Sequence, residues 1–514
     1  MSSANCSESD RDPEPPTLST GKSSPSSTTS NDIVDRVDTA WSAGHFGDEL
    51  AMTYPEPDQA YYPGGHLAVH FGELLGARAE YRVVHKLGVG SFGIVWLCQV
   101  TDSEPVRYVA VKVLTAKSLR IDQEVKTLQL LSRIAKDDPD IWKYILRPLE
   151  VSQLEGPDGM IHDVLVYPVG APVCDALFKG VKDPEGHWRS LTRQAAEAMA
   201  VCHRHGICHG DFRPQNILYR IDTFDGVPVE TIYNFLTPVA RAIRHKFDDP
   251  KACHPDYIVY PIETPNKFTE DQTTANPCAI NLCLIDWGES FEMTNPPEQG
   301  TGIPLDYASP ELVLNKKCSA ASDIWALACT MVEIRMGFTI YSFWGAGTEA
   351  TYVASVVNLL GIPPEPLWSQ IPDRWKEKCT DSTGAVLANL SGLQGLDRVK
   401  QTIHKTAAAA GRRNMCHTEA ELFGDLIGKM LTWTPEERLT IGQVVQHPWF
   451  LYTDDVAASD TTVAGFSDSP HPDVEHADVG GSMGGDSPNS DERNSTVVEP
   501  ASLELGLSRC RISS

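Results

Sequence analysis

The residues best suited to chemistry in this sequence stand close together at positions 209–216, which read HGDFRPQN. The carboxylate of Asp211 can accept a proton from an attacking hydroxyl, and the guanidinium of Arg213 can neutralise a phosphoryl group in transfer. The side chain of Asn216 can hold Mg²⁺. A chance turn rich in Asp and Asn is the alternative interpretation. His209 is expected to be a packed structural residue and not a catalyst.

A second carboxylate follows this loop in residues 284–288, which read LIDWG. A carboxylate at the end of a strand and next to a glycine can bridge Mg²⁺ and phosphate oxygens. An isolated Asp-x-Gly is usually a turn, but its place in the chain after Asn216 favours a metal ligand. Asn216 and Asp286 are therefore the predicted metal ligands.

A glycine-rich stretch precedes both motifs, at residues 88–95, which read GVGSFGIV. Such a stretch is often only a turn. A dinucleotide-binding loop would have to open a helix at Gly93, but the sequence enters an apolar, β-branched run there. A strand, loop and strand can instead cover phosphates, because glycines let backbone N–H groups approach them closely. The residues expected to bind a nucleotide here are Leu87, Gly88, Val89, Gly90, Ser91, Gly93 and Val95.

Residues 109–112, which read VAVK, place Lys112 inside an otherwise apolar strand. The lysine could be an edge residue whose amine reaches water. The glycine-rich stretch favours a lysine that neutralises nucleotide phosphates and is held by a carboxylate of the next helix. Glu124 is the predicted carboxylate, because it adjoins the apolar stripe of that helix. Other acids nearby in sequence remain alternatives: Glu73, Glu80 and Asp122.

The elements that must position these residues change in type along the chain. Alternating, β-branched patterns predict strands, and apolar residues at helical spacing predict helices. The expected strands are 81–87, 94–100, 107–114 and 162–169, and the expected helices include 119–134, 191–205 and 322–336. The predicted fold class is α+β, with a small β-rich lobe followed by a mainly helical lobe.

Composition divides the chain into a core and two tails. Residues 1–60 and 451–514 are rich in Ser, Pro, Gly and acids. We therefore expect residues 1–60 to be mostly disordered and residues 451–514 to be disordered. Residues 61–450 form the predicted domain, with lobes at about 61–168 and 169–450 and a spacer insert at about 219–279. Eight aromatic residues among the 61 of the spacer indicate that part of it packs on the domain.

The chain has 514 residues and a formal net charge of −26. Residues 1–75 and residues 451–514 each hold 12 acids and 3 bases, which leaves only −8 for the remainder. This acidity argues against direct nucleic-acid binding and agrees with basic partners or simple solubility. The sequence has neither a membrane-spanning apolar run nor a leader pattern, and its 13 cysteines lack paired spacing. We therefore expect reduced thiols, no zinc site and a location in the cytoplasm and nucleus.

In this order the motifs resemble those of eukaryotic protein kinases, over about residues 61–450. The kinase pattern of glycine-rich loop, VAIK lysine, HRD loop, DFG and APE is similar to GVGSFGIV, VAVK, HGDFRPQN, DWG and SPE here. The resemblance implies the bilobal kinase fold, ATP and Mg²⁺ as cofactors, and transfer of the γ-phosphoryl group to a protein serine or threonine. It also implies that Lys112 holds the α- and β-phosphates and that Glu124 orients Lys112.

Two regions resemble the SR-protein kinases of the CMGC group more narrowly. They are the entry segment at residues 62–97, which begins YPGGH, and the 69 residues between Asn216 and Asp286. Gly210 in place of the HRD arginine also fits that family, and GIPLDYASPE at residues 302–311 resembles its fungal members. The family implies Arg/Ser-rich protein substrates, and a monomer is expected. Two departures put this substrate class in doubt: Ala308 replaces an arginine, and the acidic docking run retains only Glu349.

The sequence also allows two alternatives to an SR-protein kinase. One is a CMGC-group kinase of other specificity, and the other is a pseudokinase scaffold, although the lysine, both aspartates and the asparagine are present. Gly210 also removes the arginine that would grip a phosphate on the activation loop, so activity without loop phosphorylation is expected. Two structural roles are predicted as well, a buried ion pair between Glu311 and Arg438 and capping of the catalytic loop by Asp323.

Overall fold

The computed structural model describes residues 56, 58–116, 121–173, 183–220, 225–235, 241–243, 255, 257–259, 261, 282–341, 348–379, 395–409 and 415–453. The tails that were predicted to be disordered lie outside the described residues, apart from 56, 58–60 and 451–453. Among the described residues, no helix combines the length and the apolar composition that crossing a membrane requires. Each cysteine in the described ranges is a free thiol, and most of these thiols are buried.

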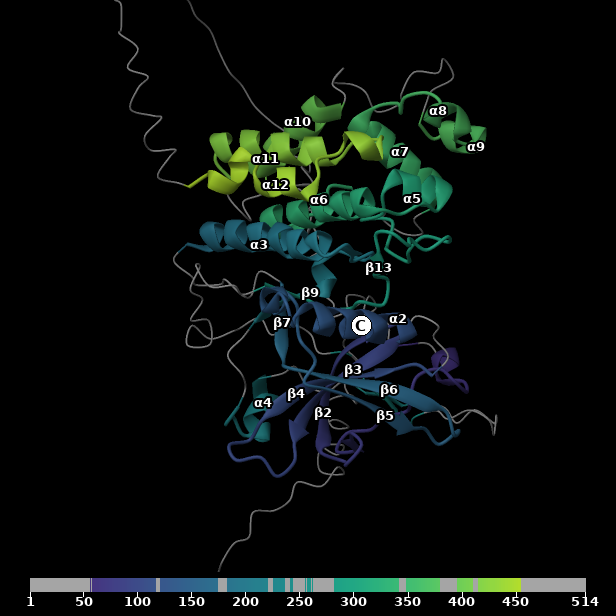
Figure 1. Ribbon diagram of the computed structural model, residues 1–514, viewed down its shortest axis with the longest axis vertical. Coiled ribbons are helices and arrows are strands. Elements are labelled where there is room, and N and C mark those ends of the chain that lie inside the picture. The colour runs from purple at the N-terminus through teal and green to yellow at the C-terminus, as the bar shows by residue number, and fades with distance from the viewer. Residues whose placement is uncertain are drawn as a thin grey trace, which may run out of the picture. The chain divides into compact units, whose positions relative to one another are not determined.

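A six-stranded antiparallel sheet forms the first lobe, in the order β1-β2-β3-β4-β6-β5 (Figure 1). Its strands are β1 Leu74–Leu75, β2 Tyr81–Gly90, β3 Gly93–Val100, β4 Tyr108–Leu114, β5 Glu150–Glu155 and β6 Ile161–Tyr167. The four strands expected from sequence are confirmed. The short β1 was not predicted, and neither was β5, whose sequence EVSQLE alternates between exposed and half-buried residues. Every residue of β4 is buried, because β3 and β6 flank it within the sheet.

One long helix, α2 (Ile121–Ile134), accompanies the sheet. Its buried residues Leu128 and Leu131 belong to the hydrophobic core, as the helical spacing predicts. Glu124 lies one turn before Leu128, so it is also buried, with 3% of its surface exposed. The helix therefore carries a carboxylate into the protein interior beside the sheet.

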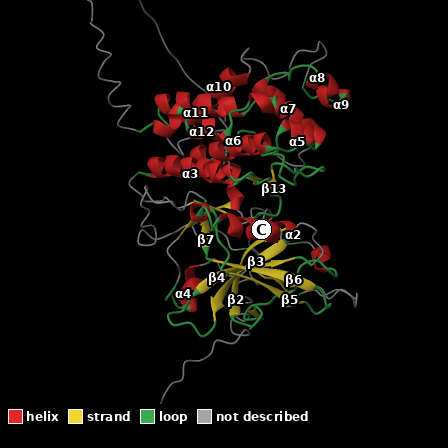
Figure 2. Cartoon of the chain, viewed as in Figure 1, coloured by secondary structure: helices red, strands yellow, loops and turns green. Residues whose placement is uncertain are grey.

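Helices dominate the chain after residue 183 (Figure 2). The longest are α3 Pro184–Arg204, α6 Ala320–Met336, α7 Glu349–Leu360, α10 Gly395–Ala409 and α11 His417–Met430, and the shorter ones are α4 Val229–Phe235, α5 Pro310–Asn315, α8 Leu367–Gln370, α9 Asp373–Lys376 and α12 Ile441–Val445. Helix α6 is buried along most of its length. It begins with a capping box at Ser319 and ends at Gly337, which has a left-handed backbone. A β-rich lobe followed by a helical lobe confirms the predicted α+β class.

Short strands frame the functional loops between these lobes. Strand β8 (Ile207–Cys208) pairs with β13 (Phe291–Glu292), and β9 (Ile217–Arg220) lies between β7 (Gly170–Pro172) and β12 (Leu282–Leu284). Residues 209–216 connect β8 to β9, and Asp286 lies two residues after the end of β12. Since β12 pairs with β9, the end of one loop and the start of the other are held side by side.

Part of the spacer insert packs on the first lobe. The phenol of Tyr108, at the start of β4, donates a hydrogen bond to the carbonyl of Val227 over 2.8 Å. The backbone N–H of Phe71 donates to the phenol oxygen of Tyr257 over 3.0 Å, and their rings stack. Tyr257 belongs to β11 (Tyr257–Val259), which pairs with β10 (Arg241–Ile243). The expectation that part of the spacer packs on the domain is therefore confirmed.

A segment before the sheet also belongs to the folded lobe. A short 3-10 helix (Asp58–Tyr61) follows Glu56, and Glu56 makes an ion pair with Lys86 of β2. The side chain of Lys86 is fully buried, and its amine lies over the ring of Trp96. The hydroxyl of Tyr61 donates a hydrogen bond to the same carboxylate. Burial of an ion pair is costly unless both ions are hydrogen-bonded, so this arrangement ties the segment to β2.

Candidate active site

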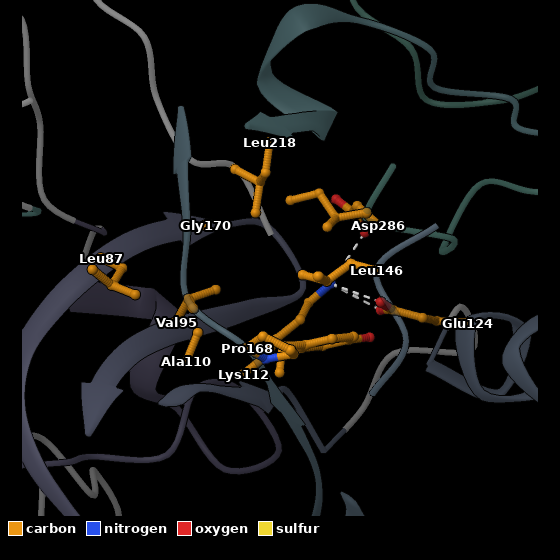
Figure 3. A pocket seen from close by; sticks show the side chains of 12 residues that line it. Leu87, Val95, Ala110, Lys112, Glu124, Leu146, Pro168, Gly170, Leu218 and Asp286 are labelled. Carbon is orange, nitrogen blue, oxygen red and sulfur yellow. Dashed lines mark hydrogen bonds and ion pairs between the residues drawn. The ribbon is translucent and has the colours of Figure 1, made fainter. Parts of the chain in front are cut away.

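A pocket opens beside β3 and β4, and residues from both lobes line it (Figure 3). Figure 3 shows apolar side chains from Leu87, Val95 and Ala110 on one part of the wall and charged groups at the other. Leu146, Tyr167, Leu218 and Ile285 complete the apolar lining. An apolar pocket with a few convergent charged groups is the usual form of a small-molecule site.

Three charged side chains meet in this pocket. The amine of Lys112 on β4 lies 2.8 Å from Oε2 of Glu124 on α2 and 3.1 Å from Oδ1 of Asp286 after β12. Burial alone would lower the pKa of Lys112, but the charges of Asp286 and Glu124 outweigh it and raise the pKa above its ordinary value. Lys112 therefore carries a permanent positive charge, held between carboxylates from two separate elements.

The choice of Glu124 among the nearby acids has a structural reason. Glu73 contacts His70, and Glu80 contacts Arg78, so both act within the loops around β1 and β2. Glu124 is the acid that the buried face of α2 directs toward Lys112.

The loop between β8 and β9 holds the predicted base. The side-chain NH₂ of Asn216 donates to the carbonyl of Asp211 over 2.8 Å and to its carboxylate over 2.7 Å. The Nε atom of Arg213 lies 3.1 Å from the same carboxylate. Burial raises the pKa of Asp211 above its ordinary value, with Arg213 opposing the shift and Asp286 adding to it. Asp211 is thus fixed in position and is more basic than an exposed aspartate.

Asp323 of α6 fixes the start of the loop between β8 and β9 by hydrogen bonds to its backbone. Its carboxylate accepts hydrogen bonds from the backbone N–H groups of His209 over 2.7 Å and of Gly210 over 3.0 Å. The imidazole of His203 lies 3.0 Å from the same carboxylate. Burial would raise the pKa of Asp323, but these hydrogen bonds outweigh it and lower the pKa. The predicted capping role of Asp323 is confirmed.

His209 itself is packed, as predicted. It is 1% exposed, and its Nε2 lies 3.1 Å from the carbonyl of Ile285. Its ring lies 4.9 Å from that of Trp287, measured between centroids. The tryptophan is almost fully buried, so the large residue of the DWG segment packs on the catalytic loop.

Gly210 occupies a position that another residue would strain. Its φ angle is +76°, a conformation that side chains with a Cβ rarely adopt. A Cβ built there would lie 2.1 Å from the carbonyl oxygen of Glu289 in the following segment. The absence of a side chain therefore lets two functional segments approach each other closely.

The glycine-rich hairpin has a different arrangement from the one the spacing suggested. Leu87 and Val95 line the pocket, whereas Gly88, Val89, Gly90, Ser91 and Gly93 are not part of its lining. Gly93 pairs with Gly90 of β2 and with Leu114 of β4. A Cβ at Gly93 would lie 2.8 Å from the carbonyl oxygen of Val113. Close packing of β3 on β4 therefore explains this glycine, independently of any phosphate.

The predicted metal ligands supply oxygen donors of the kind that Mg²⁺ prefers. Asp286 offers a carboxylate at the charged end of the pocket, and its φ of +64° is a strained conformation for a non-glycine residue. In Asn216 the amide nitrogen bonds Asp211, so the oxygen of that amide is the group suited to a cation. The donor set fits Mg²⁺.

Sequence reasoning missed several lining residues, among them Ala110, Leu146, Tyr167 and Leu218. They are apolar residues in strands and connections, and their sequence pattern does not separate them from the rest of the core. Their inward position follows only from the three-dimensional arrangement.

The predicted ion pair further along the chain is also confirmed. Arg438 makes two hydrogen bonds to the carboxylate of Glu311, over 2.8 and 2.7 Å. The same guanidinium donates to the carbonyls of Ala321 and Thr432. The pair fixes α5, and with it the end of the segment that begins at Asp286.

Comparison with known proteins agrees with this geometry. The family model described as protein kinase domain matches residues 81–225 and 262–450. Dual specificity protein kinase CLK1 of Mus musculus is 23% identical over 399 residues, covering 75% of this chain and 68% of its own. Serine/threonine-protein kinase SRPK of Physarum polycephalum is 24% identical over 426 residues, covering 78% and 92%. Dual specificity protein kinase KNS1 of Saccharomyces cerevisiae is 26% identical over 285 residues, covering 54% and 34%.

The predicted resemblance to SR-protein kinases is thus confirmed, and it extends to kinases of the CLK type. The family model interrupts its match at residues 226–261, inside the predicted spacer. Because this model covers more than half of the chain, the protein belongs to the protein kinase family and is an enzyme of the serine/threonine protein kinase type.

Proposed function

We propose that this kinase transfers the γ-phosphoryl group of Mg-ATP to serine hydroxyls in basic, Arg/Ser-rich protein segments. The observation that carries the proposal is the position of Lys112, which contacts carboxylates of two separate elements inside an apolar pocket. This arrangement suits a ligand with one apolar end and one polyanionic end. ATP, with its base and its phosphates, is such a ligand.

We assign the following roles in Mg-ATP binding to residues of this site. The apolar wall formed by Leu87, Val95 and Ala110 receives the base, and Lys112 neutralises phosphate oxygens. Asp286 and Asn216 would hold Mg²⁺, which neutralises negative charge on the phosphates when it is bound.

Asp211 is the proposed base for the acceptor hydroxyl. Its raised pKa increases its affinity for the proton that the serine loses. Asn216 and Arg213 hold its carboxylate in one orientation. Arg213 is also the proposed stabiliser of the phosphoryl group in transfer.

The preference for basic substrates has support from local charge. Residues 286–311 include six acids and contain neither lysine nor arginine. Glu292 and Glu298 of this segment are exposed, and Glu292 belongs to β13, which pairs with β8 just before the catalytic loop. Exposed carboxylates in this segment would attract arginine-containing peptides and repel acidic ones.

A positional-scanning peptide library tests the specificity of the purified full chain with Mg-ATP. Arginine next to the acceptor serine is the expected preference, and a requirement for proline directly after the serine would contradict it. In the double variant Glu292→Gln/Glu298→Gln, KM should rise for an Arg-flanked peptide at low salt. KM for an uncharged peptide is the matched control and should not change.

Asp211→Asn tests the chemical step separately. We expect kcat to fall by about two to four orders of magnitude while ATP affinity is retained. Asp140→Asn, which removes an exposed carboxylate paired with Lys143, is the control and should keep full activity. ATP binding by the unaltered protein without transfer to any library peptide would instead indicate a pseudokinase scaffold.

Two further proposals concern the protein in the cell. We propose a monomer that is present in both cytoplasm and nucleus, where basic Arg/Ser-rich substrates can be met. Light scattering of the purified protein tests the first, and microscopy of the tagged full chain tests the second. A stable dimer would contradict the first proposal, and absence from either compartment would contradict the second.

A further inference from the structure

Helices α10 and α11 lie side by side in the second lobe (Figure 1). Their apolar contact includes Val399 and Ile403 of α10, which are fully buried. Lys400 of α10 adds an ion pair with Asp425 of α11 over 3.3 Å. This interface contributes no residue to the lining of the nucleotide pocket. It does carry a second cluster of groups able to bind a ligand.

The cluster consists of His404 on α10 and of His417 and Glu421 on α11. His417 and Glu421 are four residues apart, so they project from one face of α11. One ligand atom from each of the three residues lies within 4.8 Å of the other two. Nε2 of His404 lies 2.6 Å from Oε1 of Glu421, and the two imidazole rings are 4.9 Å apart between centroids.

We propose that these three residues bind one Zn²⁺ ion. Two imidazole nitrogens and one carboxylate oxygen are a donor set that Zn²⁺ uses in proteins. Mg²⁺ is a poor fit, because it demands near-octahedral oxygen coordination and retains its waters. Zinc–ligand bonds of about 2.0–2.2 Å place tetrahedral ligand atoms roughly 3.4 Å apart. The present separations, from 2.6 Å up to at most 4.8 Å, lie on either side of that value, so binding requires side-chain torsions of the three residues to change.

The site is accessible to an ion from solution. His417 and Glu421 are exposed, and the side chain of His404 is 26% exposed. Zn²⁺ replaces the hydrogen bond between His404 and Glu421, and the proton on the ligating nitrogen moves to the other ring nitrogen or to solvent. With three protein ligands, the fourth position takes water.

The sequence-based expectation of no zinc site rested on the spacing of the cysteines. The proposed site uses no cysteine, and its ligands come from two helices that are separate in sequence. The expected consequence of binding is a cross-link between α10 and α11. An ion that binds only the folded chain raises the free energy of unfolding, and at concentrations above its Kd this gain grows with the logarithm of the ion concentration.

The test measures Zn²⁺ binding by isothermal titration of the full chain, with excess Mg²⁺ present to occupy oxygen sites. Co²⁺ serves as a second probe, because tetrahedral cobalt gives visible absorption bands. We expect one ion per chain, a rise in melting temperature with Zn²⁺, and a Co²⁺ spectrum typical of nitrogen and oxygen ligands. His404→Ala, His417→Ala and Glu421→Gln should each weaken Zn²⁺ binding by more than about 10-fold.

The matched control is His205→Ala. His205 also contacts a surface carboxylate, Asp138, over 3.0 Å, but the two do not belong to a three-ligand cluster among the described residues. Zn²⁺ affinity should be unchanged in this variant, and the melting temperatures of all variants without metal report whether they fold. Unchanged affinity in the three ligand variants would overturn the proposal. Loss of binding in Cys416→Ser but not in His404→Ala would overturn it as well, by assigning the ion to a thiol.

Discussion

Replacement of Gly210 with alanine is expected to slow phosphoryl transfer by about 100-fold while the protein still folds. Gly210 has a left-handed backbone, and the Cβ of alanine would lie 2.1 Å from the carbonyl oxygen of Glu289. The left-handed conformation alone costs a residue with a side chain about 1–2 kcal/mol. Van der Waals contact requires about 3.5 Å, so the two segments must separate by more than about 1 Å.

The kinetic effect follows from the position of Gly210 directly before Asp211. Its N–H is held by Asp323, so the shift is transmitted to the catalytic carboxylate and not absorbed by a free loop. A misplacement of about 1 Å at a reacting group costs about 100-fold in rate. The assay compares kcat with a fixed peptide substrate and the free energy of unfolding in urea for both proteins.

Gly206→Ala is the matched control for this experiment. Gly206 has a φ of +72° and lies four residues earlier, but a Cβ built there meets no atom within 4 Å. We expect Gly206→Ala to lose about 1 kcal/mol of stability and almost no activity, so the difference between the variants isolates the collision with Glu289. If Gly210→Ala keeps kcat within threefold of the unaltered protein, the reasoning is wrong.

Three further predictions follow from features already described. Arg438→Met should lower the free energy of unfolding by about 3–5 kcal/mol, because it removes a buried guanidinium and leaves the half-buried carboxylate of Glu311 without its cation. Addition of Glu311→Gln should recover most of the loss in urea titrations. Burial lowers the pKa of His85 to about 4, so between about pH 6.5 and pH 4 the unfolded chain binds this proton and the folded chain does not. The contribution of neutral His85 to the free energy of unfolding is therefore fully present above pH 6.5 and falls by about 3 kcal/mol toward pH 4. His85→Phe should remove this contribution to the pH dependence of the free energy of unfolding. Phosphatase treatment should leave kcat unchanged, since Gly210 cannot grip a phosphate on the activation segment, and a silenced enzyme would contradict this.

Much of the fold could be predicted because the local sequence agrees with the final structure. Strands β2, β3, β4 and β6 are rich in β-branched and aromatic residues, and the helices α2, α3 and α6 have apolar residues on their buried faces. Strand β5 has too few apolar residues to give a strand signal. It forms because β6 supplies its hydrogen-bond partners.

The positions of the charged residues Lys112, Asp211 and Asp286 could be predicted because each stands in a short motif whose other residues indicate a single chemical role. Partners were less predictable, because contact depends on distance in space. Glu124 differed from the other acids only by the direction in which α2 presents it. For Gly93 the spacing suggested a phosphate contact. In the structure a Cβ at this position would lie 2.8 Å from the carbonyl oxygen of Val113, and Val113 belongs to β4, which the spacing of the hairpin does not include.

The ion pair of Glu56 with Lys86 has a consequence for how the protein can be divided. The region shared with other kinases begins at residue 81, yet Lys86 is buried against a carboxylate 25 residues before that start. A protein shortened to the shared region would place the Lys86 ammonium in the interior of β2 without Glu56. We therefore expect a protein that begins at residue 81 to be less stable than one that begins before Glu56, because it loses the partner of a buried ammonium.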